Sequence, residues 1–272
     1  MSIRSQEFDS PTSRQVWPIS SGVEQRLDKA WVGGSRPPLA TKDRAVSIRG
    51  IIPALHVGEK GSSPLRSTNR IIMNNLISIF PTSVMRKVYA SSFNNKQLDL
   101  FNNSDRRRIA GNSSSVDTYI LDRPELADLK EFCLAGVLDY FEKVIGATEE
   151  LEPYITQSWL NWTESGEAHH QHYHGNSIIS GVFYISTEQE DSIEFIKKDE
   201  PPYTIIPKQW TYLNSLRCRV PAEEKVLLLF PSELLHEVKP RDGNKTRISL
   251  SFNTYIRGKI GSRDLLNELI LR

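Results

Sequence analysis

The sequence has little cysteine and almost no net charge, and each shortage excludes a class of protein. Only two cysteines occur among 272 residues, Cys133 and Cys218, and no Cys-x-x-Cys pair is present, so we expect two reduced, partly buried thiols. The 34 basic and 33 acidic residues nearly cancel, which leaves no overall field to attract nucleic acid or an anionic membrane. No nucleic-acid signature is therefore found.

Long hydrophobic runs are also missing. The longest purely apolar run, Val226–Phe230, is far too short to span a bilayer. Residues 1–10 show no apolar stretch behind a basic start, as a secretory leader would. We therefore expect a soluble, intracellular protein without a membrane partner.

Residues 1–70 differ from the rest of the chain in composition. They contain six of the 15 prolines, six of the 15 glycines, and 11 basic against 6 acidic residues, without a sustained hydrophobic period. Such a composition predicts an irregular N-terminal extension. Residues 71–272 are expected to form a single domain.

The first part of that domain is predicted to supply helical support over residues 83–146. A strand-like run at 76–80 is closed by Pro81 and precedes a predicted helix from 83 to about 93. Asp122 and Glu125 resemble the start of a capped helix. Behind them, apolar residues recur every three or four positions as far as Ile145, which is typical of an amphipathic helix.

From residue 154 onward the pattern is almost entirely strand. Short alternating or apolar runs, each bounded by turn residues, occupy 154–162, 177–186, 192–196, 225–230 and 247–256. Several strands without intervening helices favour an antiparallel jelly roll, or double-stranded β-helix, whose core is 154–257. A final amphipathic stretch, 263–271, is predicted to be a C-terminal helix. The fold class is thus mainly β with flanking helices, of cupin-like type.

Four of the six histidines crowd into residues 169–174, which is the strongest chemical signal in the sequence. In an extended chain residues two apart share a face, so His170, His172 and His174 are expected to converge while His169 points away. Imidazole is a common ligand of first-row metals. On spacing alone, His170/His172 and His172/His174 are equally good metal-binding pairs.

A second half of the site is predicted around His236 and Arg247. A predicted apolar strand that includes Phe230 is followed by a turn, and His236 comes directly after this turn. Arg247 and Ser249 share one face of the next strand, and apolar residues occupy the other face. A buried arginine needs an anion, and its planar fork suits a carboxylate, so Arg247 is predicted to anchor a small dicarboxylate.

The order of these pieces resembles the 2-oxoglutarate/Fe(II)-dependent oxygenase superfamily, in particular a subfamily from bacteria and marine cyanophages. The resemblance covers about 154–257 closely and 77–100 loosely, through Phe80-Pro-Thr. It is carried by His172-x-His174, Ser180-Gly-Val-Phe-Tyr184, Phe230-Pro-Ser232, His236 and Arg247-Ile-Ser-Leu-Ser-Phe-Asn253.

The resemblance implies a role for seven side chains. It implies Fe(II) ligands at His172, His174 and His236, and co-substrate contacts at Arg247, Ser249, Asn161 and Tyr184. Asn161 lies in a Trp-x-Asn pattern that starts at Trp159, and a structural role is the alternative for both Asn161 and Tyr184. The chain departs from the usual pattern at His174, where most members have Asp or Glu, and at Gly175, where the subfamily usually has proline.

The function that the resemblance implies is a 2-oxoglutarate-dependent hydroxylase. It would use O2, release succinate and CO2, act on a small molecule or a protein side chain, and reside in the cytoplasm of a bacterium or a phage-infected host. Two alternatives stay open at this point. One is a three-histidine cupin-type dioxygenase that ignores 2-oxoglutarate. The other is a non-catalytic jelly-roll module with a structural zinc.

Overall fold

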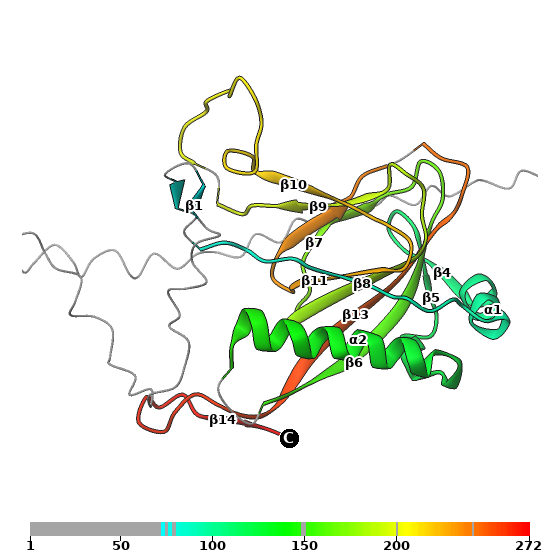
Figure 1. Ribbon diagram of the computed structural model, residues 1–272, viewed down its shortest axis with the longest axis horizontal. Coiled ribbons are helices and arrows are strands. Elements are labelled where there is room, and N and C mark those ends of the chain that lie inside the picture. Colours follow the sequence, from blue (N-terminus) through cyan, green and yellow to red (C-terminus); the bar gives the residue numbers. More distant parts are fainter. Residues whose placement is uncertain (1–71, 74–75, 78–79, 148–150, 200, 241) are drawn as a thin grey trace, which may run out of the picture. The chain divides into compact units, whose positions relative to one another are not determined.

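The chain folds into two facing antiparallel sheets, with helices on the outer side of the larger one (Figure 1). The computed structural model describes residues 72–73, 76–77, 80–147, 151–199, 201–240 and 242–272. The predicted N-terminal extension, 1–70, lies outside the described residues. Among the residues that are described, no helix has the length and apolar character needed to cross a membrane.

The major sheet has eight strands in the order β3-β11-β8-β13-β6-β5-β4, and β14 pairs with the end of β13. Its strands are β3 (Met85–Val88), β4 (Arg106–Arg108), β5 (Ser113–Ser115), β6 (Glu152–Thr163), β8 (Ile179–Ser186), β11 (Val226–Pro231), β13 (Arg247–Ile260) and β14 (Leu269–Leu271). The predicted strands in 154–256 correspond closely to β6, β8, β11 and β13.

The minor sheet has the order β10-β9-β12-β7. Its strands are β7 (His169–His172), β9 (Ser192–Ile196), β10 (Arg217–Pro221) and β12 (Leu235–Val238). From β6 to β13 the chain passes repeatedly between the two sheets, as it does in a jelly roll. The predicted double-stranded β-helix is confirmed. A separate antiparallel pair is formed by β1 (Ile72–Met73) and β2 (Leu76–Ile77), and of these two only β2 lies within the predicted strand at 76–80.

Alternation along the strands of the major sheet produces two cores. On β13, Ile248, Leu250 and Phe252 point to the helix side, where they pack with α2. The intervening residues Arg247 and Ser249 point between the sheets, as the sequence predicts. The space between the sheets is filled by a second apolar group: Val182, Tyr184, Ile193, Phe195, Ala222, Val226, Leu228 and Phe230.

Helix α2 (Ala127–Tyr140) covers the major sheet and confirms the predicted amphipathic helix. It approaches β11 so closely that a Cβ atom at Gly136 would lie 2.9 Å from a methyl carbon of Leu227. Cys133 on this helix is buried and free, while Cys218 is free but exposed, not partly buried. Two 3-10 turns, Ile120–Asp122 and Pro124–Leu126, precede α2, and a π-helical turn, Phe141–Ile145, follows it.

The helix predicted at 83–93 is wrong. Residues 85–88 form β3, because backbone pairing with β11 at the sheet edge outweighs local helical preference. The helix α1 begins later, at Asn95–Asn103, with Asn94 and Gln97 forming a capping box. The cap predicted at Asp122 is also absent: the Asp122 carboxylate accepts a hydrogen bond from Lys130 instead.

The predicted C-terminal helix at 263–271 is wrong as well. The chain turns at Gly261, whose φ of 75° suits glycine, and returns as β14 along the end of β13. Leu265 and Leu266 are exposed, so their helix-like spacing does not bury a face. The strand ladder offers backbone hydrogen bonds that a short exposed helix would not gain from packing.

Candidate metal centre and co-substrate cavity

The candidate metal centre is built on two adjacent strands of the minor sheet. His172 at the end of β7 is the direct backbone partner of His236 on β12, and their ring centroids lie 4.3 Å apart. His174 follows two residues after His172, where its backbone N–H donates to the Ser232 carbonyl oxygen over 2.9 Å. The structure thus brings together the two halves of the site that are 62 residues apart in the sequence.

The three histidines can offer one ligand atom each, and these atoms all lie within 4.8 Å of one another. His236 is buried, and His172 and His174 are half-buried. A transition metal would lie about 2 Å from each of the three nitrogen atoms.

Each of these rings has an oxygen atom beside Nδ1. For His172 it is the carbonyl oxygen of His170, at 2.7 Å, and for His236 that of Leu234, at 2.8 Å. For His174 it is Oδ1 of Asn253, at 2.7 Å. Because these oxygens only accept, each Nδ1 carries the proton and donates it, which leaves the lone pair on Nε2. Outer hydrogen bonds of this kind orient histidine ligands in metal sites.

Burial keeps all three imidazoles in the neutral form. It lowers the pKa of His236 to about 3 and that of His174 to about 4, with further lowering by neighbouring histidines. The pKa of His172 is lowered by the same cause. Since neutral imidazole is the form that binds metal, the three residues fit a divalent first-row ion.

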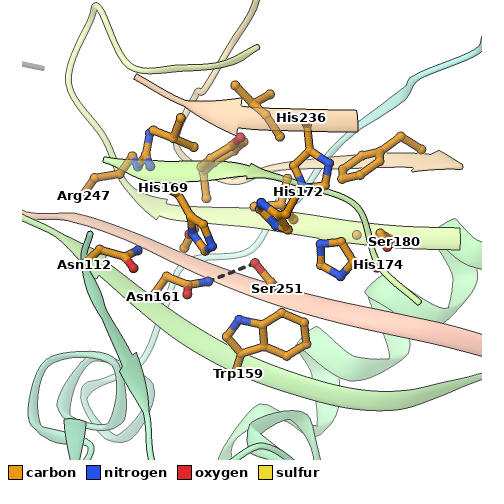
Figure 2. A pocket seen from close by; sticks show the side chains of 17 residues that line it. Asn112, Trp159, Asn161, His169, His172, His174, Ser180, His236, Arg247 and Ser251 are labelled. Atoms are coloured by element: carbon orange, nitrogen blue, oxygen red, sulfur yellow. Dashed lines mark hydrogen bonds between the residues drawn. The ribbon is translucent and has the colours of Figure 1, made fainter. Parts of the chain in front are cut away.

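The candidate metal centre opens into a cavity between the sheets. Figure 2 shows the three histidines at one end and Arg247 at the other, with Asn161 and His169 between them. Among the described residues, those that line this cavity include no aspartate and no glutamate. Beside its apolar side chains, the cavity wall therefore offers guanidinium, imidazole, indole N–H, hydroxyl and amide groups.

Arg247 and its neighbours form the far end of the cavity. Arg247 is only 4% exposed, and it donates to the Ser192 carbonyl oxygen over 3.4 Å and to Thr163 Oγ1 over 3.5 Å. Ser249 lies on the same strand and pairs with Tyr184 across the sheet. Burial raises the pKa of Tyr184 to about 12, so its hydroxyl is a neutral donor.

Asn161 also faces this cavity. Its Nδ2 donates to Ser251 Oγ over 3.0 Å, while its buried Oδ1 has no hydrogen-bond partner among the described residues. A carboxylate cannot donate to that oxygen. Asn161 can therefore serve a dicarboxylate through a water, or with the amide turned so that Nδ2 faces the ligand.

His169 is a cavity residue that the sequence places wrongly. The pairing of β7 with β12 shifts between His172↔His236 and His169↔Val238, so three steps on β7 face two on β12. This β-bulge turns His169 to the same side as His172, with ring centroids 4.5 Å apart, and leaves His170 exposed. His170 does not line the cavity, although it remains close to His169 and His172.

Two further residues of the site, Trp159 and Asn253, appear in the sequence analysis only as members of motifs, without a role. Trp159 lies in the cavity wall with its ring parallel to that of His174, at a centroid distance of 6.0 Å. Asn253 anchors His174. The alternation on β13 could have identified Asn253, because it shares the face of Arg247, Ser249 and Ser251.

Comparison with known families gives a match over the same part of the chain. Residues 157–253 match a family described as "Putative 2OG-Fe(II) oxygenase". The matched segment runs from β6 to β13 and contains all three histidines of the metal centre, Arg247 and Ser249. No curated protein matches the chain.

Solved structures with a similar fold share little sequence with this chain. A 2OG-Fe(II) oxygenase family oxidoreductase from Burkholderia pseudomallei is 13% identical, with a TM-score of 0.44 over 63% of this chain and 83% of that one. A prolyl-4-hydroxylase from Pseudomonas putida is 12% identical, with a TM-score of 0.42 over 63% and 92%. HygX from Streptomyces hygroscopicus, solved with nickel, 2-oxoglutarate and hygromycin B, is 11% identical, with a TM-score of 0.45 over 64% and 82%.

These structural likenesses are too distant to carry an argument. Over residues 157–253, which include the candidate metal centre, the chain is similar to the 2-oxoglutarate- and Fe(II)-dependent oxygenases.

Proposed function

We propose that His172, His174 and His236 hold the Fe(II) of this oxygenase and that Arg247 holds the far carboxylate of 2-oxoglutarate. Ser249 and Tyr184 assist through their hydroxyl groups, and Asn161 through its amide. The observation that carries the proposal is the placement of the histidines and Arg247 at opposite ends of one cavity.

The charges in the cavity support a dianionic co-substrate. Three neutral imidazoles leave a bound Fe(II) with its full charge of two. The described lining of this cavity holds no carboxylate, so an anionic ligand would neutralise the metal there. A dicarboxylate such as 2-oxoglutarate is such a ligand, whereas a neutral organic substrate bound alone is not.

When bound, iron and 2-oxoglutarate supply the oxidising chemistry, in which O2 is consumed, succinate and CO2 leave, and a substrate C–H bond is hydroxylated. The protein's own residues position the reactants. The Nδ1–H groups keep the imidazoles in one orientation, and Arg247 fixes the distance between the carboxylate and the metal. Phe230 and Trp159 cover the histidines with apolar surface and limit the access of water.

The substrate is a small molecule or a side chain of a peptide. A cytoplasmic location stays a prediction.

The decisive experiment uses the full chain, purified without oxygen and loaded with Fe(II). We expect 2-oxoglutarate to be converted to succinate under air, and the His236→Ala variant to lose both iron and turnover. Absence of succinate from the iron-loaded protein would favour the three-histidine dioxygenase that ignores 2-oxoglutarate. Stoichiometric zinc with no iron would favour the structural module.

A further inference from the structure

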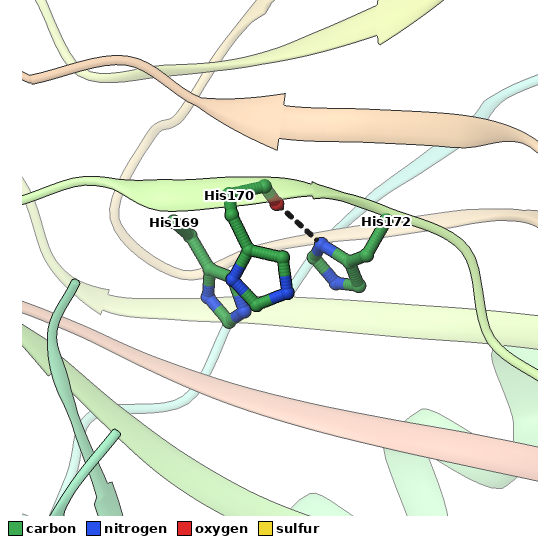
Figure 3. Close-up of side chains that lie close together, drawn as sticks. All are labelled: His169, His170 and His172. Atoms are coloured by element: carbon green, nitrogen blue, oxygen red, sulfur yellow. Dashed lines mark hydrogen bonds between the residues drawn. The ribbon is translucent and has the colours of Figure 1, made fainter. Parts of the chain in front are cut away.

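A second group of three histidines lies beside the proposed iron site. His169, His170 and His172 can offer ligand atoms that lie within 4.8 Å of one another (Figure 3). The ring centroids of His169 and His170 are 5.2 Å apart, and those of His170 and His172 are 5.3 Å apart. The β-bulge in β7 produces this arrangement, because it turns His169 to the side of His172.

The two groups differ in their access to solvent. His236 in the inner group is 4% exposed, whereas His170 in the outer group is exposed at the surface. An ion could therefore reach the outer group without entering the cavity. Three imidazoles without a carboxylate suit Zn(II), Cu(II) or Ni(II) better than Mg(II) or Ca(II), and these ions bind nitrogen ligands more tightly than Fe(II) does.

His172 belongs to both groups, but while its Nδ1 carries a proton it can bind only one metal ion at a time. Its Nδ1 donates to the His170 carbonyl oxygen over 2.7 Å, so only Nε2 has a free lone pair. If Nε2 turns to an outer ion, the inner site loses a ligand. If Nδ1 binds the outer ion instead, its hydrogen bond is lost, and the ring would have to give up its proton to keep both ions.

We propose that His169, His170 and His172 form an alternative site for a late divalent transition metal such as Zn(II), whose occupation excludes the metal from the inner site. The proposal rests on the proposed role of His172 as an iron ligand. Occupation of the outer site would switch the oxygenase off when zinc is in excess over iron.

Zinc binding to the metal-free full chain, measured by calorimetry or equilibrium dialysis, tests the proposal without any need for activity. The wild type is expected to bind one zinc ion and not two. His236→Ala should still bind one ion at the outer site, and His170→Gln should still bind one at the inner site. The double variant should bind at least 100-fold more weakly. Gln171→Ala, an exposed change on the same strand, is the matched control and should behave as the wild type.

Two results would overturn the proposal. One is a folded His236→Ala variant that binds no zinc, with His174→Ala as the substitute if circular dichroism shows His236→Ala to be unfolded. The other is two zinc ions on the wild type, which would refute mutual exclusion. If the proposed inner site does not bind zinc and only the outer site does, the result is different: His170→Gln then loses zinc, whereas His236→Ala retains it.

Enzyme activity provides a second readout. With iron at a fixed concentration, zinc should inhibit succinate formation by the wild type at concentrations at least 10-fold lower than those needed for His170→Gln. Equal inhibition of both would show that zinc acts at the inner site only, against the proposal. Mg(II) serves as the control ion and should inhibit neither.

Discussion

His174 and Asn253 are joined by a 2.7 Å hydrogen bond from Nδ1 to Oδ1, although 79 residues separate them in the chain. The same Oδ1 accepts from Ser180 Oγ over 3.1 Å, and Ser180 Oγ in turn contacts Ser232 Oγ at 2.8 Å. The backbone N–H of His174 donates to the Ser232 carbonyl oxygen. His174 is therefore held at its backbone and at its ring by residues of the major sheet and the turn that follows β11.

Replacing Asn253 with leucine should weaken iron binding. The variant keeps the shape of the side chain but removes the acceptor, so the ring of His174 loses its tautomer and orientation. Loss of an outer hydrogen bond of this kind typically costs about 10- to 100-fold in metal affinity. Equilibrium dialysis with Fe(II) or Co(II) measures it. Asn253→Asp retains an acceptor and should recover most of the affinity; equal affinity of the leucine variant and the wild type would contradict the role.

Arg247→Ala should abolish 2-oxoglutarate turnover and leave the iron content unchanged. Removing one member of a buried charge pair typically costs about 2–5 kcal/mol, which is roughly 30-fold or more in co-substrate affinity. Succinate formation and metal analysis of the same sample check both parts. Arg247→Lys keeps the charge but not the planar fork, so partial activity is expected. Loss of iron from the alanine variant would refute the assignment of Arg247 to the co-substrate.

Gly181→Ala should destabilise the protein strongly. A Cβ atom there would lie 2.2 Å from the ring of Phe252, its direct partner on β13, and Phe252 is fully buried and cannot yield. Overpacking of a core typically costs about 1–3 kcal/mol, and we expect the upper end. Urea unfolding of the metal-free protein measures the loss. Gly175→Ala is the control, since no atom lies within 4 Å of its added Cβ; equal stability of the two variants would contradict this packing.

Tyr184 should make the protein less stable at high pH. Its pKa is about 12 in the folded state, because of burial, against an ordinary value of 10.0. Above pH 10 the unfolded state releases the proton and the folded state retains it, so the stability falls as the pH rises towards 12. Tyr184→Phe removes this contribution.

The stability lost between pH 9 and pH 11 should therefore be smaller in Tyr184→Phe by about 1 kcal/mol. Unfolding of the metal-free protein in urea at both pH values measures the difference. Tyr89 and Tyr140, whose pKa values are also raised to about 12, contribute equally to both proteins and cancel. An identical pH dependence in the two proteins would show that the Tyr184 hydroxyl is not protected by burial.

The sequence predicts the strands of this fold well where burial imposes a period. The alternation of Arg247 and Ser249 with Ile248 and Leu250 is reproduced by the structure, since each face of β13 meets a different core. The prediction from the sequence is wrong at 85–88 and 263–271, where it gives helices and the structure has the strands β3 and β14. There the choice between helix and strand depends on a pairing partner far away in the chain, β11 in one case and the end of β13 in the other.

The orientation of single residues in the histidine cluster also depends on a distant pairing partner, which the local sequence does not reveal. The period of two predicts that His169 points away from the site, but one extra residue in the bulge of β7 reverses this. A bulge depends on the register with β12, which is not visible in the local sequence. The pairing of His172 with His236 could be anticipated only through the resemblance to a family.

The division of the site between the two sheets has a consequence for its assembly. The backbone pairing of His172 with His236 lies within the minor sheet, while Arg247, Ser249, Tyr184 and Asn161 all belong to the major sheet. A molecule whose two sheets have separated would thus keep two of the proposed metal ligands side by side and lose the proposed dicarboxylate site. Retention of iron would require only an intact minor sheet, whereas turnover would require the two sheets to be packed together. On heating, the enzyme should therefore lose activity before it loses iron.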